Sequence, residues 1–531
     1  MHHDSISKVH ENVFKNQAKS EQNINSIKLI KIDQLTLDSN NLTEFPEIFK
    51  NHPEIKHLTI ANNSLPNFNN LPPTLEVLEV SGNQNNNQNL DITDLHKLIH
   101  LKHLELETCG FVEIPNPTIF TQFNYLTSLS LAGNLLTEIP TELKFCRKLY
   151  ELDLSENHIT DIGKDLSEFP ALENLNISGN GLKEFICPSG IRNLLIHENN
   201  LEKFEIPAGL EQLQISNNDL KELDCTGKCN LIWIDFSKNM LRKLPKNIHQ
   251  TVVKYCYGKD NQITNLPRTI SRMRDVLEVL DLSDNDLDEN LHENLAGLEN
   301  LRILNLANNP KLVLKKVHCK FLMRTVSELN LSGSSTNYQG LVNILSFSTR
   351  NLERLSLRNC GLQEVPNSTI WENCSELKSV DFGDNSIHKI PDVVFQGLKK
   401  LETLILDKNE IDDNGLLGVK QCENLEELVV FGNNVKRVEK ILLELRSLKK
   451  FSVLEFQDNP IEGTFHCRDS GMILELQRQI VAVRKISKFF KSKKIIKKFR
   501  KTVQLAREKS ASEGKKGKKS SKGSKGSKKK K

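Results

Sequence analysis

Residue types that support catalysis or metal binding occur in this chain, but their spacing does not assemble a reactive site. The eleven cysteines are scattered, and Cys225 and Cys229 form a C-x-x-x-C pair with no second pair of ligands after it. The fifteen histidines are spread singly, so His103 and His197 are interpreted as solvated strand residues rather than general bases. Neither a Gly-rich phosphate loop nor a nucleophile elbow occurs. We therefore expect no enzymatic activity, no cofactor and no bound metal.

A short phrase recurs along most of the sequence. Residues 149–159 read L-x-x-L-x-L-x-x-N-x-I, and the phrase returns at 172–182, 277–287 and 401–411. Because side chains alternate along a strand, both leucines of L-x-L point to one side and the residue between them points away. The Asn is expected to bond backbone groups of its own turn and of the neighbouring coil. Each unit would then bury its leucines against the next unit.

Nineteen such units align on their Asn position between residues 40 and 459, with a mean step of about 23 residues. Residues 29 to 461 resemble the leucine-rich repeat family on this phrase. The resemblance implies an α/β fold: a leucine-rich repeat solenoid, curved as a horseshoe, with a parallel sheet on its concave face. The docking motif of type-1 protein phosphatase is matched by residues 378–382, but Val380 and Phe382 fall on core positions there. That match is interpreted as structural.

The convex segments are expected to mix 3₁₀, extended and short helical structure. Many contain a proline after the Asn, which favours extended or 3₁₀ backbone. Steps of only 19 or 20 residues precede Asn83, Asn199 and Asn218, so those segments are predicted to be extended. Longer steps after residue 285 leave room for short helices at 291–298, 393–398 and 438–445.

These patterns divide the chain into four predicted segments. Residues 1–28 form a polar cap or a disordered segment, 29–470 form the solenoid, 471–508 form a basic amphipathic helix, and 509–531 form a disordered Lys/Gly/Ser tail. Residues 484–531 contain 22 Lys and Arg against two acidic residues, a net charge of +20. The whole chain carries +4, so residues 1–483 carry about −16.

The cellular compartment is predicted from three absences in the sequence. The N-terminus has no apolar signal-peptide core, no apolar run reaches the 18 residues of a membrane helix, and no cysteine cluster flanks the repeats. We expect a monomeric cytoplasmic protein, with association with the cytoskeleton, cilium or nucleus left open.

The residues expected to bind a protein partner lie among the outward positions of the strands. Trp233, Tyr255 and Tyr257 gather in adjacent repeats, a composition typical of binding hot spots. The alternative is that the degenerate repeat at 253–263 turns inside out and buries them. Ile405, Val429 and Phe431 form a second apolar patch, which the tail helix would cover in the alternative interpretation. The candidate protein-binding residues are Trp233, Tyr255, Tyr257, Asp235, Asp281, Ile405, Val429 and Phe431.

The tail contains a second candidate site. Residues 483–494 resemble the IQ motif bound by calmodulin-like proteins, with Arg484 and Phe489 replacing its Gln and Gly. A basic amphipathic helix also suits an anionic membrane surface or an acidic cytoskeletal surface. Nucleic acid is a further option that we do not favour, and the tail could instead be solubilising or pair with the acidic body. The candidate residues are Val483, Lys488, Phe489, Phe490, Lys493, Ile496 and Phe499.

The sequence thus favours a non-enzymatic scaffold or adaptor that binds a protein on its concave face. One alternative is a signalling, cytoskeletal or ciliary regulator switched by a calcium sensor through the tail helix. Another is a regulatory subunit in a phosphatase or GTPase pathway.

Overall fold

A computed structural model describes residues 33–461, with gaps that fall within 45–53, 84–89, 163–164, 289–296, 313–324, 336–349 and 438–446. The chain divides into two compact units, residues 1–330 and 331–531. Each unit is a stack of coils, and each coil contributes one three-residue strand to a parallel sheet. The predicted ends of the solenoid, and the segments 1–28, 471–508 and 509–531, lie outside the described residues.

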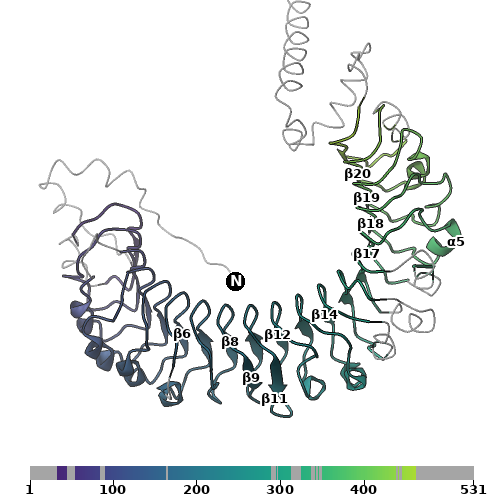
Figure 1. The fold of residues 1–531 in the computed structure, drawn as a ribbon. Helices are drawn as coiled ribbons and strands as arrows, with labels where there is room; N and C mark the ends of the chain where they lie inside the picture. Colours follow the sequence, from purple (N-terminus) through teal and green to yellow (C-terminus); the bar gives the residue numbers. More distant parts are fainter. Residues whose placement is uncertain are drawn as a thin grey trace, which may run out of the picture. The chain divides into compact units, whose positions relative to one another are not determined.

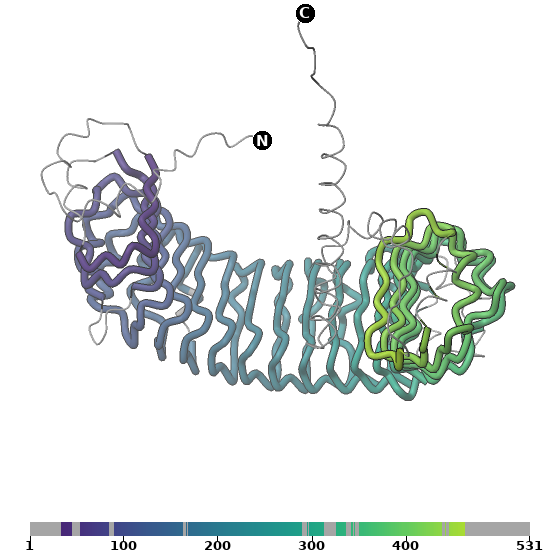
Figure 2. The backbone as a smooth tube through the Cα atoms, turned by 90° about the horizontal axis from the view of Figure 1, so that it is seen from above, coloured from purple at the N-terminus to yellow at the C-terminus, as the bar shows by residue number. Residues whose placement is uncertain are grey.

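The first unit stacks its coils side by side (Figure 2), and each strand of its sheet pairs with the strand of the next coil. We call the side of the sheet that faces away from the leucine core the concave face. The strands of this sheet are β1 (Gln34–Thr36), β2 (His57–Thr59), β3 (Val77–Glu79), β4 (His103–Glu105), β5 (Ser128–Ser130), β6 (Glu151–Asp153), β7 (Asn174–Asn176), β8 (Asn193–Leu195), β10 (Gln212–Gln214), β12 (Trp233–Asp235), β13 (Tyr255–Tyr257), β14 (Val279–Asp281), β15 (Ile303–Asn305) and β16 (Glu328–Asn330).

The second unit repeats this arrangement. Its strands are β17 (Arg354–Ser356), β18 (Ser379–Asp381), β19 (Thr403–Ile405), β20 (Glu427–Val429) and β21 (Val453–Glu455), and they pair in parallel in chain order. In both units the middle residue of a strand is the core leucine or its equivalent, and its two neighbours lie on the concave face. Leu152, Leu213 and Leu404 are fully buried, as the L-x-L alternation predicts.

The Asn of each phrase forms the predicted ladder. Asn157 is 4% exposed, and its Nδ2 donates to the carbonyl oxygens of Leu154 (3.1 Å) and of Leu131 in the preceding coil (3.0 Å). Its Oδ1 accepts the backbone N–H of Leu136 at 3.0 Å. Where a cysteine replaces the Asn, the thiol is the donor instead: Sγ of Cys360 lies 3.3 Å from the carbonyl oxygen of Leu331. Each coil is therefore joined to its neighbour by buried polar bonds as well as by leucines.

Short 3₁₀ helices and turns form much of the convex side, as the prolines predict. In the part of the chain that the structure describes, the 3₁₀ helices are η3 (Thr93–Lys97), η4 (Pro117–Gln122), η5 (Thr141–Phe145), η6 (Asp165–Glu168), η7 (Ile248–Gln250), η8 (Arg268–Met273) and η9 (Leu417–Gln421). The second unit also contains a short α-helix, α5 (Ser368–Trp371). The prediction of a helix at 393–398 is wrong, because residues 392–397 form turns. Much of the helices predicted at 291–298 and 438–445 lies outside the described residues.

The short repeat that ends at Asn218 has an extended convex segment, as predicted, and the next repeat, for which none was predicted, has one too. Strands β9 (Lys203–Ile206) and β11 (Glu222–Cys225) pair in parallel and form a small second sheet on the side away from β8 and β12 (Figure 1). A step of about 20 residues leaves too little chain for a helical turn, so the backbone satisfies its polar groups by pairing with the next coil. Cys225 and Cys229, the C-x-x-x-C pair noted in the sequence, are 2% and 1% exposed and belong to the core.

Candidate functional site

Trp233, Tyr255 and Tyr257, which we call the aromatic cluster, lie on the concave face of the first unit. Strands β12 and β13 pair with Trp233 opposite Tyr255 and with Asp235 opposite Tyr257. All three aromatic side chains are partly exposed, whereas Ile234 and Cys256 between them point into the core and are 0% and 2% exposed. The weak repeat at 253–263 therefore does not turn inside out. Its strand keeps the normal alternation, because the small Cys256 occupies the core position of a leucine.

The rings of Trp233 and Tyr257 contact each other diagonally across the two strands. Their centroids are 6.0 Å apart and their planes are inclined by 49°, a tilted aromatic pair. Such a pair holds two large side chains in place on a flat sheet and leaves part of each ring available to a ligand. The cluster therefore has the chemical character of a preorganised binding surface.

Two aspartates flank this cluster, and internal bonds orient both. Asp235 Oδ1 accepts the backbone N–H of Ser237 at 2.9 Å. Asp281 Oδ1 accepts the backbone N–H and hydroxyl of Ser283, and its Oδ2 accepts Nδ2 of Asn305 at 2.8 Å. Burial, followed by the charges of Asp281 and Asp235, raises the pKa of Tyr257, so its phenol stays neutral.

A second group of polar side chains occurs on β3 and β4 of the same face. Nε2 of His103 lies 2.9 Å from Oε1 of Glu105, and the ligand atoms of Glu79, His103 and Glu105 all lie within 4.8 Å of one another. The hydrogen bond with Glu105 raises the pKa of His103, and burial, then the charge of Glu105, raises the pKa of Glu79. Among the described residues this is the group whose atoms could hold a divalent ion. Interpreting His103 as a solvated residue missed the H-x-E spacing that aligns it with Glu105.

The apolar patch predicted in the second unit is only partly available. Ile405 and Phe431 are partly exposed, but Val429, which pairs with Ile405, is 8% exposed. The main chain of Phe431 is bonded to the preceding coil, since its carbonyl oxygen accepts the N–H of Lys408 at 2.7 Å. This patch is smaller and more buried than the aromatic cluster.

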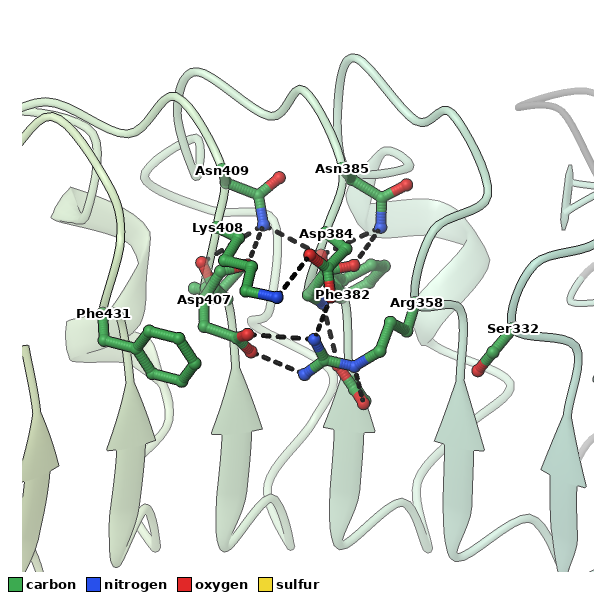
Figure 3. Close-up of polar contacts among 12 residues, drawn as sticks. Ser332, Arg358, Phe382, Asp384, Asn385, Asp407, Lys408, Asn409 and Phe431 are labelled. Carbon is green, nitrogen blue, oxygen red and sulfur yellow. Dashed lines mark hydrogen bonds and ion pairs between the residues drawn. The ribbon is translucent and has the colours of Figure 1, made fainter. Parts of the chain in front are cut away.

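Beside that patch, Arg358 joins three carboxylates that sequence reasoning did not connect (Figure 3). Its Nε donates to Asp381 at 3.0 Å, and its two terminal nitrogens donate to Asp407 at 2.9 and 2.6 Å in a bidentate pair. The same guanidinium also bonds Asp384, which Lys408 approaches at 3.2 Å. Asp407 is only 1% exposed, so its charge depends on Arg358 for compensation.

Gly383 makes this connection between coils feasible. It lies at the same phrase position as Arg358 and Asp407, in the coil between them, and the guanidinium passes over it. A Cβ at residue 383 would lie within about 2.5 Å of the guanidinium atoms of Arg358. The signal in the sequence is that one phrase position holds an arginine, a glycine and an aspartate in three successive repeats. It cannot be recognised before the coils are stacked.

The remaining predicted sites have simpler outcomes. Val380 and Phe382 are fully buried, so the phosphatase-type match is a pair of core residues. The tail residues Val483, Lys488, Phe489, Phe490, Lys493, Ile496 and Phe499 lie outside the described residues. No helix in the described part of the chain is long and apolar enough to cross a membrane.

The stacked coils define a class of fold, and the models of known protein families that match the sequence describe the same class. A family model described as leucine rich repeat matches residues 123–182 and 350–411, and a second leucine rich repeat model matches residues 276–298. Together with the stacked parallel strands and the Asn ladder, these matches assign the leucine-rich repeat fold to the described residues.

The relatives with this fold differ widely from one another. The chain is 26% identical over 378 residues to Toll-like receptor 9 of Sus scrofa, covering 65% of this chain and 31% of the receptor. It is 24% identical over 292 residues to the protein flightless-1 homolog of Caenorhabditis elegans, covering 55% of this chain and 18% of that protein. The chain thus spans less than a third of the length of either relative.

Solved structures also match much of the chain. A leucine-rich repeat protein of Leptospira interrogans matches with a TM-score of 0.48 and 19% identity, covering 80% of this chain and 95% of that one. The ectodomain of the Arabidopsis receptor kinase HAESA, in complex with a peptide hormone ligand, matches with a TM-score of 0.49 and 22% identity, covering 81% and 74%.

Proposed function

We propose that this protein is a non-enzymatic interaction scaffold, and that a protein partner docks on the concave face of the first unit over the aromatic cluster. The observation that carries the proposal is the tilted pair of Trp233 and Tyr257, partly exposed on a rigid parallel sheet. Large aromatic side chains on an ordered surface supply binding energy with little loss of conformational entropy. The leucine-rich repeat fold supports this proposal, because its open sheet is broad enough for an extended contact.

The aromatic cluster is favoured over the second apolar patch for two reasons. Val429 in that patch is buried, and the adjacent Arg358 is already paired with three aspartates. A partner at the second patch would gain less new burial. The proposal therefore places the main contact on β12 and β13.

The test replaces both exposed rings in the full-length protein. Trp233→Ala with Tyr257→Ala should reduce recovery of a directly cross-linked partner by about 10-fold or more, as expected for hot-spot residues. Tyr125→Ala with Tyr150→Ala is the matched control, because these rings are 48% and 45% exposed and lie outside the sheet strands. Circular dichroism should show that both variants fold. Unchanged recovery with the cluster variant, or equal loss with the control, would refute the docking site.

A further inference from the structure

The strand positions on the concave face of the first unit contribute acidic side chains and neither lysine nor arginine. In each of its strands the first and third residues lie on this face, and together these residues include no lysine or arginine. The seven carboxylates among them are Glu79, Glu105, Glu151, Asp153, Asp235, Asp281 and Glu328. A ligand that follows this face therefore meets acidic side chains from β3 to β16, which favours a cationic ligand.

The aromatic cluster lies within this acidic face. Tyr257 is opposite Asp235 on β12 and opposite Asp281 on β14, so a carboxylate flanks it on each side. Nearby lysines do not neutralise these acids, because Lys254 pairs with Glu278 at 3.3 Å and Lys259 pairs with Asp284 at 3.4 Å. The site combines aromatic faces with carboxylates that have no basic partner on the sheet.

One carboxylate oxygen at this site remains available. Both oxygens of Asp281 accept hydrogen bonds from within the protein. Asp235 uses Oδ1 for the N–H of Ser237, whereas its Oδ2 has no hydrogen-bond partner within the described part of the chain. Asp235 is therefore the residue that can accept a hydrogen bond from a ligand lying on the neighbouring rings.

We propose that Trp233, Tyr257 and Asp235 form a subsite for an arginine side chain of an extended basic segment in the partner. The guanidinium stacks on the aromatic rings and donates to Oδ2 of Asp235. This inference rests on the proposed function, because it names the chemistry of the partner that docks there. Arginine fits better than lysine, since its planar cation stacks on a ring and still directs N–H donors toward a carboxylate.

The chain contains its own reporter for this subsite. It has two tryptophans, and Trp371 is fully buried, with its Nε1 donating to the carbonyl oxygen of Pro366 at 3.0 Å. In a full-length Trp371→Phe protein, Trp233 is the remaining fluorophore of this type. A ligand that stacks on Trp233 changes its fluorescence directly.

The experiment titrates this protein with octa-arginine and, separately, with octa-lysine of equal charge. Octa-arginine should change the Trp233 fluorescence saturably and bind at least about 5-fold more tightly than octa-lysine, because stacking favours guanidinium. Asp235→Asn should weaken octa-arginine binding by about 10-fold, since it removes the charge but keeps an oxygen for the N–H of Ser237. Glu138→Gln, which removes an equal charge from an exposed position in an outer segment, is the matched control and should leave the affinity within about 2-fold.

Three outcomes would overturn the subsite. The first is equal affinity for the two peptides, and the second is an equal loss of affinity in the Asp235→Asn and Glu138→Gln proteins. The third is no response of Trp233 fluorescence to octa-arginine, as would occur if the protein's own basic tail held the site. The proposed function fails separately, when the aromatic double variant keeps its partner. If the aromatic double variant loses its partner but the protein shows no preference for octa-arginine, the inference about the subsite is refuted and the proposed function is not.

Discussion

At the scale of single residues, side chains of this solenoid act across coils that are far apart in the sequence. Arg358 is 49 residues from Asp407, yet both terminal nitrogens of its guanidinium bond that buried carboxylate. Hydrogen bonding to Asp407 is the main reason that the pKa of Arg358 lies above its ordinary value. The side chain spans the intervening coil because residue 383 has no Cβ. Arg358 and Gly383 therefore act as one structural unit.

This coupling predicts the effect of Gly383→Ala. The added methyl group displaces the guanidinium and leaves Asp407 without its donors, so the free energy of unfolding of the second unit should fall by about 2–4 kcal/mol. Denaturant titration monitored by Trp371, which lies in that unit, measures the loss.

The control is the double-mutant cycle with Arg358→Ala. In that background Gly383→Ala should cost less than about 0.5 kcal/mol, because no guanidinium remains to be displaced. Additive costs would contradict the coupling.

At the scale of the repeat element, the Asn ladder adds side-chain hydrogen bonds to the backbone pairing between coils. Asn157 provides donors to carbonyl oxygens of two coils and accepts the N–H of Leu136 from the outer segment of the preceding coil. The residue before the Asn adopts a positive φ, as at Glu156 (54°) and Asp284 (53°), which turns the chain sharply after the strand. The Asn therefore stabilises a turn that most residues would disfavour.

Asn157→Ala should lower the free energy of unfolding by about 1–3 kcal/mol, because it leaves the N–H of Leu136 buried without its acceptor. The carbonyl oxygen of Leu131 loses one of its two donors and keeps Nδ2 of Asn134. Hydrogen exchange at the Leu136 amide should accelerate. The exposed Asn200 is the control, and Asn200→Ala should cost less than about 0.5 kcal/mol. Equal costs at the two positions would contradict the role assigned to the ladder.

Much of this element could be predicted from the sequence, and the parts that could not have a common physical cause. The inward leucines, the Asn bonds and the extended segment around Ile206 follow from local spacing, and all are present. The Arg358 cluster and the group of Glu79, His103 and Glu105 depend on contacts between coils. The helix predicted at 393–398 failed because a longer step permits a helix but does not require one. The turns at 392–397 satisfy the same spacing.

At the scale of the whole molecule, the candidate binding surface and the Arg358 cluster lie in different units. The first unit carries the aromatic cluster on an acidic concave face, and the second contains the Arg358 cluster, which stabilises its own coils. In a solenoid each coil contacts mainly its neighbours, so changes in one unit should leave distant coils of the other intact. Effects of Trp233 and Tyr257 on binding can therefore be separated from effects on the stability of the second unit.

The most direct test of the central claim places a photoreactive amino acid on either side of the first unit of the full-length protein. One variant carries benzoylphenylalanine at Gln214, whose strand pairs with that of Trp233 on the concave face. The other carries it at Ile186, which is 92% exposed on the outer segment of its coil. The account predicts that a partner cross-links from residue 214 and not from residue 186. A partner captured from residue 186 alone, or equally from both positions, would contradict it.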